Sequence, residues 1–320
     1  MLRSFLLYLS KADWARHIVT QWAFAKRAAG RFVAGERLED AIQVVNQLNN
    51  LGINATLDRL GEHTTNAEKA RRATDEIIEM LTAIEETGIQ SNISIKLTQI
   101  GIDLDEHLCI ENLTCILERA RSINNFVRID MEDSPWVDKT LQLYRLMHSE
   151  RGFTNTGVVI QSYLYRSEQD IRQLGLEGAR VRLCKGAYKE SPEIAFPNKR
   201  DVDANFDRLA RMLLDCSLSA GAPTASSDGK IPPPPAIATH DEQRIQQAKT
   251  YAQKIGLPKT ALEFQMLNGI RRDLQIQLAE EGYPVRVYVP FGTEWYPYFT
   301  RRLAERPANL WFFVSHFFRK

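Results

Sequence analysis

The chain has 320 residues, of which 44% are hydrophobic and 25% charged, and its formal net charge is +1. This is the composition of an ordinary globular protein with ample residues for a core, and so small a charge gives no electrostatic reason to expect a nucleic-acid partner. The four cysteines lack the spacing of metal ligands or of a disulfide scaffold, and no run approaches the roughly 18 apolar residues of a membrane span, so we expect a cytoplasmic protein.

The first 50 residues have a helical pattern. Residues 1–10 contain a short apolar run, but Lys11 and Asp13 follow at once, which predicts an amphipathic helix rather than a signal peptide. Apolar residues recur at helical spacing between Leu38 and Leu48, and Gly52 ends that run. We therefore expect an N-terminal helical segment over residues 1–50 and a separate domain over residues 51–320.

Beyond residue 52 the chain alternates short β-type runs with longer amphipathic segments. The expected strands lie at 53–58, 93–98, 127–131, 158–162, 181–184, 236–240, 262–267 and 285–289. The expected helices include 67–87, 110–123, 136–149, 167–174 and 205–220. Eight parallel β/α units predict an α/β fold, a closed (β/α)8 TIM-type barrel preceded by N-terminal helices. An open doubly wound sheet is the alternative, but the Gly-rich turn it usually carries after its first strand is absent here.

A stretch rich in Ser, Gly and Pro at 224–235 predicts a loop before the sixth strand. Gly229-Lys230 lacks the remaining residues of a phosphate-binding loop. The sequence assigns no role to the loop at 217–234.

Polar residues stand near the end of every expected strand, which is where the active site of a β/α barrel lies. They are Asp58, Glu62, Lys96, Asp130, Gln161, Arg182, Lys185, Thr239, His240, Gln265, Asn268 and Tyr288. No His-x-x-x-His, Cys-x-x-Cys or Gly-x-Ser-x-Gly pattern occurs, which argues against a metal site and a hydrolytic triad. A set rich in Lys and Arg predicts a pocket for a phosphorylated or carboxylated ligand.

Two segments carry most of this prediction. The run Arg182-Leu-Cys-Lys-Gly-Ala-Tyr188 leads from a strand into a loop where Gly186 and Ala187 would let a ligand approach the backbone, although a routine turn is the alternative. After residues 285–289, Pro290 and Gly292 are expected to break the strand before a helix.

That last helix places four side chains on one face. They are Tyr298, Arg301, Arg302 and Glu305, at helical spacing. The face suits a clamp for a small carboxylate, and a solvated surface with an Arg–Glu pair is the alternative.

Together these segments resemble the proline dehydrogenase family of flavin-dependent (β/α)8 barrels, in its small monofunctional bacterial form. The resemblance rests on Leu57-Asp-Arg-Leu-Gly-Glu62, Ser94-Ile-Lys-Leu-Thr98, Arg128-Ile-Asp-Met-Glu-Asp133, Gln161, Arg180-Val-Arg-Leu-Cys-Lys-Gly-Ala-Tyr188, Ala238-Thr-His-Asp241, Glu263-Phe-Gln-Met-Leu-Asn-Gly269 and the last helix. It implies oxidation of L-proline to Δ1-pyrroline-5-carboxylate, the first step of proline catabolism. FAD would be the cofactor, and a quinone would accept the electrons.

The resemblance also implies roles for single residues. Lys96, Arg301 and Arg302 would hold the proline carboxylate, and Glu62 would pair with Arg301 as a gate. Arg182 would lie near the flavin, and Asp130 would have an orienting role. The residues that would wall the proline ring are Tyr188, Leu267, Tyr288 and Tyr298, and those that would contact FAD are Met131, Gln161, Arg182, Lys185, Gly186, Ala187, Tyr188, Thr239 and His240.

Two positions depart from the pattern of the family. Cys184 stands where Val is expected, and Asn268 where some relatives carry His.

The resemblance also implies that Glu305, one turn further along the last helix, would steady Arg302. The length leaves no room for a fused aldehyde dehydrogenase domain, so the resemblance implies that a separate protein takes the product.

Other interpretations stay open. A different flavin barrel, such as a folate reductase, would leave the paired Arg301 and Arg302 without a task, and a non-enzymatic binding barrel would take up no FAD. The aromatic tail at 310–320 ends in Arg319 and Lys320, which suits peripheral contact with a membrane surface. Packing on the barrel or on a partner subunit is the alternative for this tail.

Overall fold

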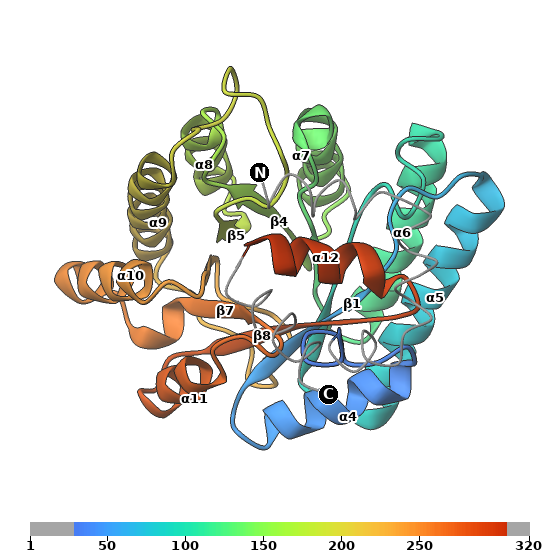
Figure 1. Ribbon diagram of the computed structural model, residues 1–320, viewed down its shortest axis with the longest axis horizontal. Helices are drawn as coiled ribbons and strands as arrows, with labels where there is room; N and C mark the ends of the chain where they lie inside the picture. The colour runs from blue at the N-terminus through green and yellow to red at the C-terminus, as the bar shows by residue number, and fades with distance from the viewer. Residues whose placement is uncertain (1–28, 306–320) are drawn as a thin grey trace, which may run out of the picture.

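The protein folds as a closed barrel of eight parallel strands, in the order of the sequence (Figure 1). The structure is a computed structural model that describes residues 29–305, with side chains as far as residue 302. The strands are β1 Asn54–Arg59, β2 Ser91–Ile95, β3 Val127–Ile129, β4 Thr156–Gln161, β5 Arg180–Cys184, β6 Pro235–Ala238, β7 Glu263–Leu267 and β8 Val285–Phe291. Pairing of β1 with β8 closes the barrel, and the predicted TIM-type fold is confirmed.

Helices separate the strands and surround the barrel. They are α4 Leu38–Asn49, α5 Ala67–Thr87, α6 Glu106–Ser122, α7 Val137–Arg145, α8 Ser167–Leu176, α9 Lys199–Ser219, α10 Glu242–Ile255, α11 Arg272–Glu280 and α12 Trp295–Glu305, with short turns η1 Ser134–Trp136, η2 Leu146–Glu150 and η3 Lys259–Ala261. In the part of the chain that the structure describes, no helix has the length and apolarity that a bilayer crossing requires.

Helix α5 shows how local signals set these bounds. The Asn66 side chain caps the helix by accepting a hydrogen bond from the Lys69 amide, and Gly88 ends it in the left-handed conformation. Between the caps, one face is buried through residues that include Ile77 and Ile84. The helix therefore has the bounds that the sequence predicts.

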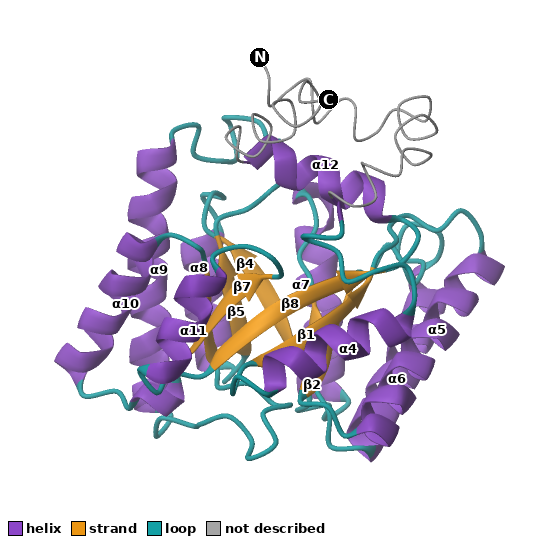
Figure 2. Ribbon diagram, turned by 60° about the horizontal axis from the view of Figure 1, so that its bottom comes forward, coloured by secondary structure: helices purple, strands orange, loops and turns teal. Residues whose placement is uncertain are grey.

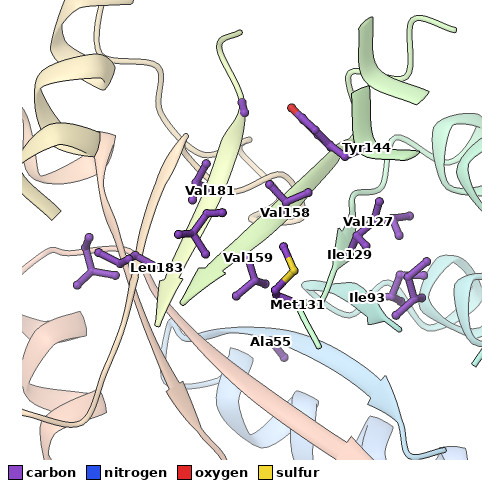
Figure 3. Close-up of a cluster of buried hydrophobic side chains, with 14 of the residues drawn as sticks. Ala55, Ile93, Val127, Ile129, Met131, Tyr144, Val158, Val159, Val181 and Leu183 are labelled. Atoms are coloured by element: carbon purple, nitrogen blue, oxygen red, sulfur yellow. The ribbon is translucent and has the colours of Figure 1, made fainter. Parts of the chain in front are cut away.

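Strand residues alternate between an apolar layer under the helices and the barrel interior. Figure 3 shows part of the apolar layer, including Ile129, Val158 and Leu183. The interior instead carries buried polar side chains, among them Thr56, Asn92, Ser94, Arg128, Arg182, Glu263, Gln265 and Arg286. Barrels of this class are usually filled by Val, Ile and Leu. The interior of this barrel is therefore held largely by hydrogen bonds.

The two ends of the barrel are covered differently. Helix α12 lies across the end where the strands finish (Figures 1 and 2). The loop at 221–234 lies at the opposite end, where its carbonyls accept hydrogen bonds from Asn92, Arg180 and Arg286, which stand at or near the starts of their strands. The expected loop before β6 thus meets the starts of several strands.

Several predicted boundaries differ from the structure. Helices α6 and α9 begin at Glu106 and Lys199, before the expected 110 and 205, and α9 runs to Ser219, so the loop expected at 217–234 begins only after that residue. Strand β8 does not break at Pro290, because that residue pairs with Asp58 and its carbonyl accepts a hydrogen bond from the Ala34 amide. The single helix expected at 136–149 is divided into η1, α7 and η2. The predictions for residues 1–28 and for the tail at 310–320 lie outside the described residues.

Candidate functional site

A cavity of about 530 Å³ opens at the C-terminal ends of the strands, under α12. Most of the candidate residues named from the sequence line it. The exceptions are Asn268, whose amide donates instead to the Phe32 carbonyl at 3.5 Å, and Glu305, whose side chain lies outside the described residues. The candidates that line the cavity are Asp58, Glu62, Lys96, Asp130, Met131, Gln161, Arg182, Lys185, Gly186, Ala187, Tyr188, Thr239, His240, Gln265, Leu267, Tyr288, Tyr298, Arg301 and Arg302. The fold thus gathers residues more than 200 positions apart into one site.

Arg182 crosses the floor of this cavity and is buried. Its Nη1 donates to Asp130 Oδ1 at 2.7 Å and to Ser94 Oγ at 3.1 Å, while its Nε donates to Gln265 Oε1 at 2.6 Å. The Tyr288 hydroxyl donates to the other oxygen of Asp130 at 2.9 Å. Asp130 therefore accepts from two sides and orients both neighbours.

Tyr288 keeps its proton in this setting. Burial raises the pKa of its hydroxyl well above the ordinary value of 10.0, and the carboxylates of Asp130 and Asp58 raise the pKa further. The Tyr288 ring also lies 5.4 Å from Arg182 Cζ, within cation–π range. Tyr288 is therefore a hydrogen-bond donor and an apolar wall rather than a base.

Lys96 projects from the loop that follows β2, and Asp58 holds it. Its Nζ lies 3.2 Å from both carboxylate oxygens of Asp58, and both side chains are buried. Burial alone would lower the pKa of Lys96, but Asp58 and Asp130 outweigh it and raise the pKa. Lys96 is therefore a fixed cation in the cavity.

Two arginines of α12 cover the cavity from above. Arg301 makes a two-bond ion pair with Glu62, at 2.7 and 3.1 Å, so the pair predicted from the sequence is formed. Burial would raise the pKa of Glu62, yet Arg301 and Lys96 hold it below the ordinary value of 4.5. Arg302 places its Cζ 5.2 Å from the centre of the Tyr298 ring. The predicted helix thus presents its cations to the cavity.

The segment after β5 lines another wall. Lys185 Nζ donates to Asp241 Oδ2 at 2.8 Å and also bonds Asp203. Gly186 has φ of +106°, and a Cβ there would stand 2.4 Å from the Tyr163 ring. The backbone conformation and the packing against Tyr163 therefore require a glycine at position 186. The backbone of Gly186 also lines the cavity.

Gln161 and His240 reach the cavity with their side chains already oriented. Gln161 Nε2 donates to the carbonyls of Met131 and Glu132, at 3.3 Å each. Its buried Oε1 accepts no hydrogen bond from any residue between 29 and 302. His240 Nε2 accepts from the Leu267 amide at 2.9 Å. Gln161 therefore offers a buried acceptor for a ligand N–H group.

The charges of the lining favour an anionic ligand. The lining includes six cations, Lys96, Arg182, Lys185, Lys199, Arg301 and Arg302, against four carboxylates, Asp58, Glu62, Asp130 and Asp241. An excess of cations in a partly enclosed cavity attracts carboxylates and phosphates.

Some participants were not identified from the sequence. Asp58 and Gln265 stand among the polar strand ends, but the sequence assigns neither a partner. Asp203 lies in α9, well after β5, and no local signal connects it with Lys185. Pairings of this kind follow from the barrel geometry rather than from spacing along the chain.

Comparison with known proteins gives consistent matches over nearly the whole chain. A family model described as proline dehydrogenase matches residues 41–314. Proline dehydrogenase 1 of Bacillus subtilis (strain 168) is 41% identical over 323 residues, which span 100% of both chains. The proline dehydrogenase of Deinococcus radiodurans is 43% identical over 290 residues, or 90% of this chain and 89% of that protein.

A solved structure shares the fold. Proline utilization A from Bdellovibrio bacteriovorus, inactivated by N-propargylglycine, matches with a TM-score of 0.78 at 26% identity. The match covers 88% of this chain and 33% of that longer one. The likeness therefore extends to about a third of that protein.

Proposed function

The chain belongs to the proline dehydrogenase family of oxidoreductases, and from this we propose that it oxidises L-proline to Δ1-pyrroline-5-carboxylate, the first step of proline catabolism. FAD is the cofactor in this proposal, and a quinone is the final electron acceptor. One observation carries it: the cations suited to a small carboxylate lie in the same cavity as Arg182 and the residues assigned to the flavin.

The residues present fit FAD. A cavity of about 530 Å³ is within the range that encloses cofactor-sized ligands. Gln161 Oε1 offers a buried acceptor to a ring N–H, and Lys185 and the Gly186–Ala187 backbone suit a pyrophosphate. Met131, Thr239 and His240 complete this wall. FAD, when bound, supplies the acceptor for the hydride that proline loses.

The substrate carboxylate is assigned to Lys96, Arg301 and Arg302. The Lys96 ammonium is held by Asp58 but has three donors, so it can also meet a carboxylate. Arg301 is held in place by Glu62. Charge-assisted bonds from two directions would fix the ring against the walls formed by Tyr188, Leu267, Tyr288 and Tyr298.

Arg182 is assigned to the flavin side of the reaction. Its guanidinium is fixed by Asp130, Ser94 and Gln265, so its positive charge is oriented before substrate binds. Asp130 accepts two hydrogen bonds and orients its donors, and Tyr288 retains its proton. The proton of the proline nitrogen is therefore assigned to solvent.

An anaerobic titration tests this function directly. The purified protein, loaded with FAD, is titrated with L-proline while the flavin absorbance is followed. We expect bleaching that saturates with proline. Reduction by NADH without reduction by proline would favour a different flavin barrel, such as a folate reductase, and a protein that takes up no FAD would favour a binding barrel.

The proposal also includes quinone as the electron acceptor and contact of the C-terminal tail with a membrane surface. Residues 310–320, which include an aromatic run, lie outside the described residues, and their contact with a membrane surface stays a prediction. Deleting them should abolish the stimulation of quinone reduction by lipid vesicles. An unchanged vesicle dependence would refute a membrane role for this tail. The product is expected to pass to a separate aldehyde dehydrogenase.

A further inference from the structure

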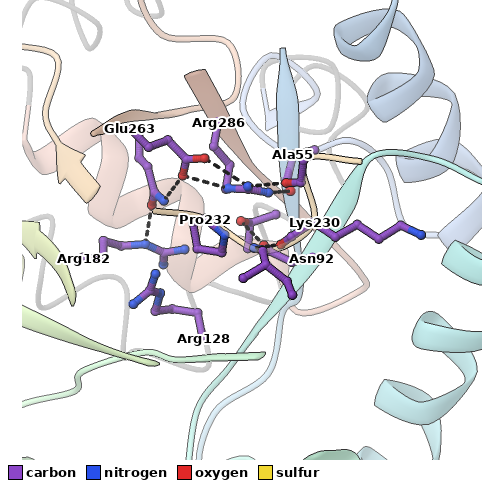
Figure 4. Close-up of polar contacts among 12 residues, drawn as sticks. Ala55, Asn92, Arg128, Arg182, Lys230, Pro232, Glu263 and Arg286 are labelled. Atoms are coloured by element: carbon purple, nitrogen blue, oxygen red, sulfur yellow. Dashed lines mark hydrogen bonds and ion pairs between the residues drawn. The ribbon is translucent and has the colours of Figure 1, made fainter. Parts of the chain in front are cut away.

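A continuous chain of hydrogen bonds runs through the barrel interior from Arg286 to Arg182 (Figure 4). Arg286 on β8 binds Glu263 on β7 through Nε at 2.9 Å and Nη2 at 3.0 Å. Glu263 Oε1 accepts from Gln265 Nε2 at 2.6 Å, and Gln265 Oε1 accepts from Arg182 Nε at 2.6 Å. The chain thus links β8, β7 and β5 with fully or largely buried groups.

The chemistry of these groups permits one arrangement. Guanidinium groups only donate hydrogen bonds, and an ionised carboxylate only accepts them. Gln265 must therefore turn its NH2 to Glu263 and its carbonyl to Arg182. Beside it, β6 contributes only the small Ala236 at the level of Arg182, which leaves room for the guanidinium to reach β7. A fully satisfied buried network of this kind is rigid.

At its far end, this chain of hydrogen bonds reaches the loop at 221–234 through Arg286. Arg286 Nη2 donates to the Gly229 carbonyl at 2.5 Å, and Nη1 donates to the Ala55 carbonyl at 2.7 Å. Gly229 has φ of +67°, and a Cβ there would stand 2.1 Å from Asn54 Oδ1. The loop is also bound through the Lys230 carbonyl, which accepts from Asn92 at 2.9 Å. Gly229 is therefore tightly fitted against the barrel.

We propose that Gln265, Glu263 and Arg286 are positioning residues for Arg182, and that the loop at 221–234 anchors them from the opposite end of the barrel. The inference rests on the proposed function, because Arg182 is the cation assigned to the flavin. An arginine held at Nε by a neutral amide keeps its direction without a second carboxylate beside it. The loop, to which the sequence assigns no role, thereby acts on the cavity through the barrel.

The first test is Gln265→Met, which keeps the side-chain volume but removes both hydrogen bonds. We expect kcat for proline to fall about tenfold, as for the loss of one hydrogen bond to a charged group, with a smaller change in KM. We also expect a more negative midpoint potential of the flavin and a displaced Arg182 guanidinium in a crystal structure. Asn112→Leu is the control, because it removes a buried amide bonded to the Ile100 carbonyl on the outer layer.

The second test changes the anchor alone. Gly229→Ala should push the loop away from Asn54, disturb Arg286 and shift the midpoint potential in the same direction as Gln265→Met. Gly221→Ala is the matched control, since Gly221 has φ of +84° in the same loop but nothing within 4 Å of an added Cβ. Both variants should lose thermal stability, and only Gly229→Ala should change the midpoint potential of the flavin.

The outcomes separate this inference from the proposed function. Gln265→Met with Arg182 unmoved and an unchanged midpoint potential would overturn the positioning role. An effect of Gly229→Ala no larger than that of Gly221→Ala would overturn the anchoring role. If Gln265→Met does not fold, Gln265→Asn keeps an amide that is too short to bridge both partners and should give the same shifts. A wild-type flavin that proline does not reduce contradicts the function, whereas the crystallographic position of Arg182 still tests the chain.

Discussion

The cationic side chains of the cavity differ in the contacts that hold them. Substituting one of them can therefore change proline binding, the stability of the fold, or both. Arg302 lies against Tyr298 on α12, whereas the buried Lys96–Asp58 pair joins the ends of β1 and β2. Arg302→Met should therefore leave FAD bound and raise the KM for proline about 10- to 100-fold, the effect of losing a charge-assisted bond. Steady-state kinetics and the flavin absorbance of the purified variant measure both. Arg72→Met, at an arginine that is 80% exposed on α5, is the control. A normal KM for proline in Arg302→Met would contradict the carboxylate clamp and would favour the alternative, in which this face of α12 is a solvated surface.

Lys96 should behave differently because Asp58 depends on it. Burial raises the pKa of Asp58, so removing the ammonium leaves a carboxyl group that is costly to ionise. Lys96→Met should lower the free energy of unfolding by about 3–5 kcal/mol, the cost of breaking a buried pair, and also raise the KM for proline.

The double variant Lys96→Met/Asp58→Asn resolves the two roles of Lys96. It should recover much of the stability, measured by urea unfolding, and none of the proline affinity. Recovery of both would show that Lys96 acts only through the stability of the site.

At the scale of elements, one ion pair joins α12 to the loop after β1. Arg301 holds the pKa of Glu62 below 4.5 against the effect of burial. A lowered pKa in the folded state contributes stability above the unfolded value, and this contribution is lost as pH falls through the folded pKa. Wild type should therefore exceed Glu62→Gln in stability at neutral pH, and the difference should shrink as the pH falls below about 4.5.

Thermal unfolding from pH 3 to 7 measures this difference. Glu168→Gln is a suitable control, because Glu168 also pairs with arginines but lies on α8. A difference between wild type and Glu62→Gln that does not depend on pH would contradict the assigned charge state of Glu62.

Elements also show what the sequence could predict. Helix α5 has its predicted bounds because the Asn66 cap and Gly88 directly flank a segment that carries one buried face. Strand β8 runs past Pro290 because its ends are set by pairing with β1, which no local signal reports. Local signals thus define helices well, while strand ends depend on partners distant in sequence.

Across the whole molecule, the same contrast explains the site. Its lining was predictable because the parallel strands of a barrel end on one side, so a polar residue at each strand end must meet the others. The interior chain from Arg286 to Gln265 was not, because Glu263 and Arg286 lie at strand starts, where a polar residue is usually solvated. Only closure of the barrel buries both and brings them together.

The proposed FAD site is formed by several strands of the barrel, so FAD binding should affect the stability of the whole fold. FAD would contact residues at the ends of β3, β4, β5 and β6, so its removal should lower the unfolding temperature. An excess of FAD about 100-fold above its Kd should stabilise the protein by about 2.7 kcal/mol. Riboflavin lacks the pyrophosphate assigned to Lys185, so it should raise the unfolding temperature less at equal concentration. Lys185→Met should reduce this difference between the two ligands. Equal stabilisation of the wild type by FAD and riboflavin would contradict a pyrophosphate site at Lys185.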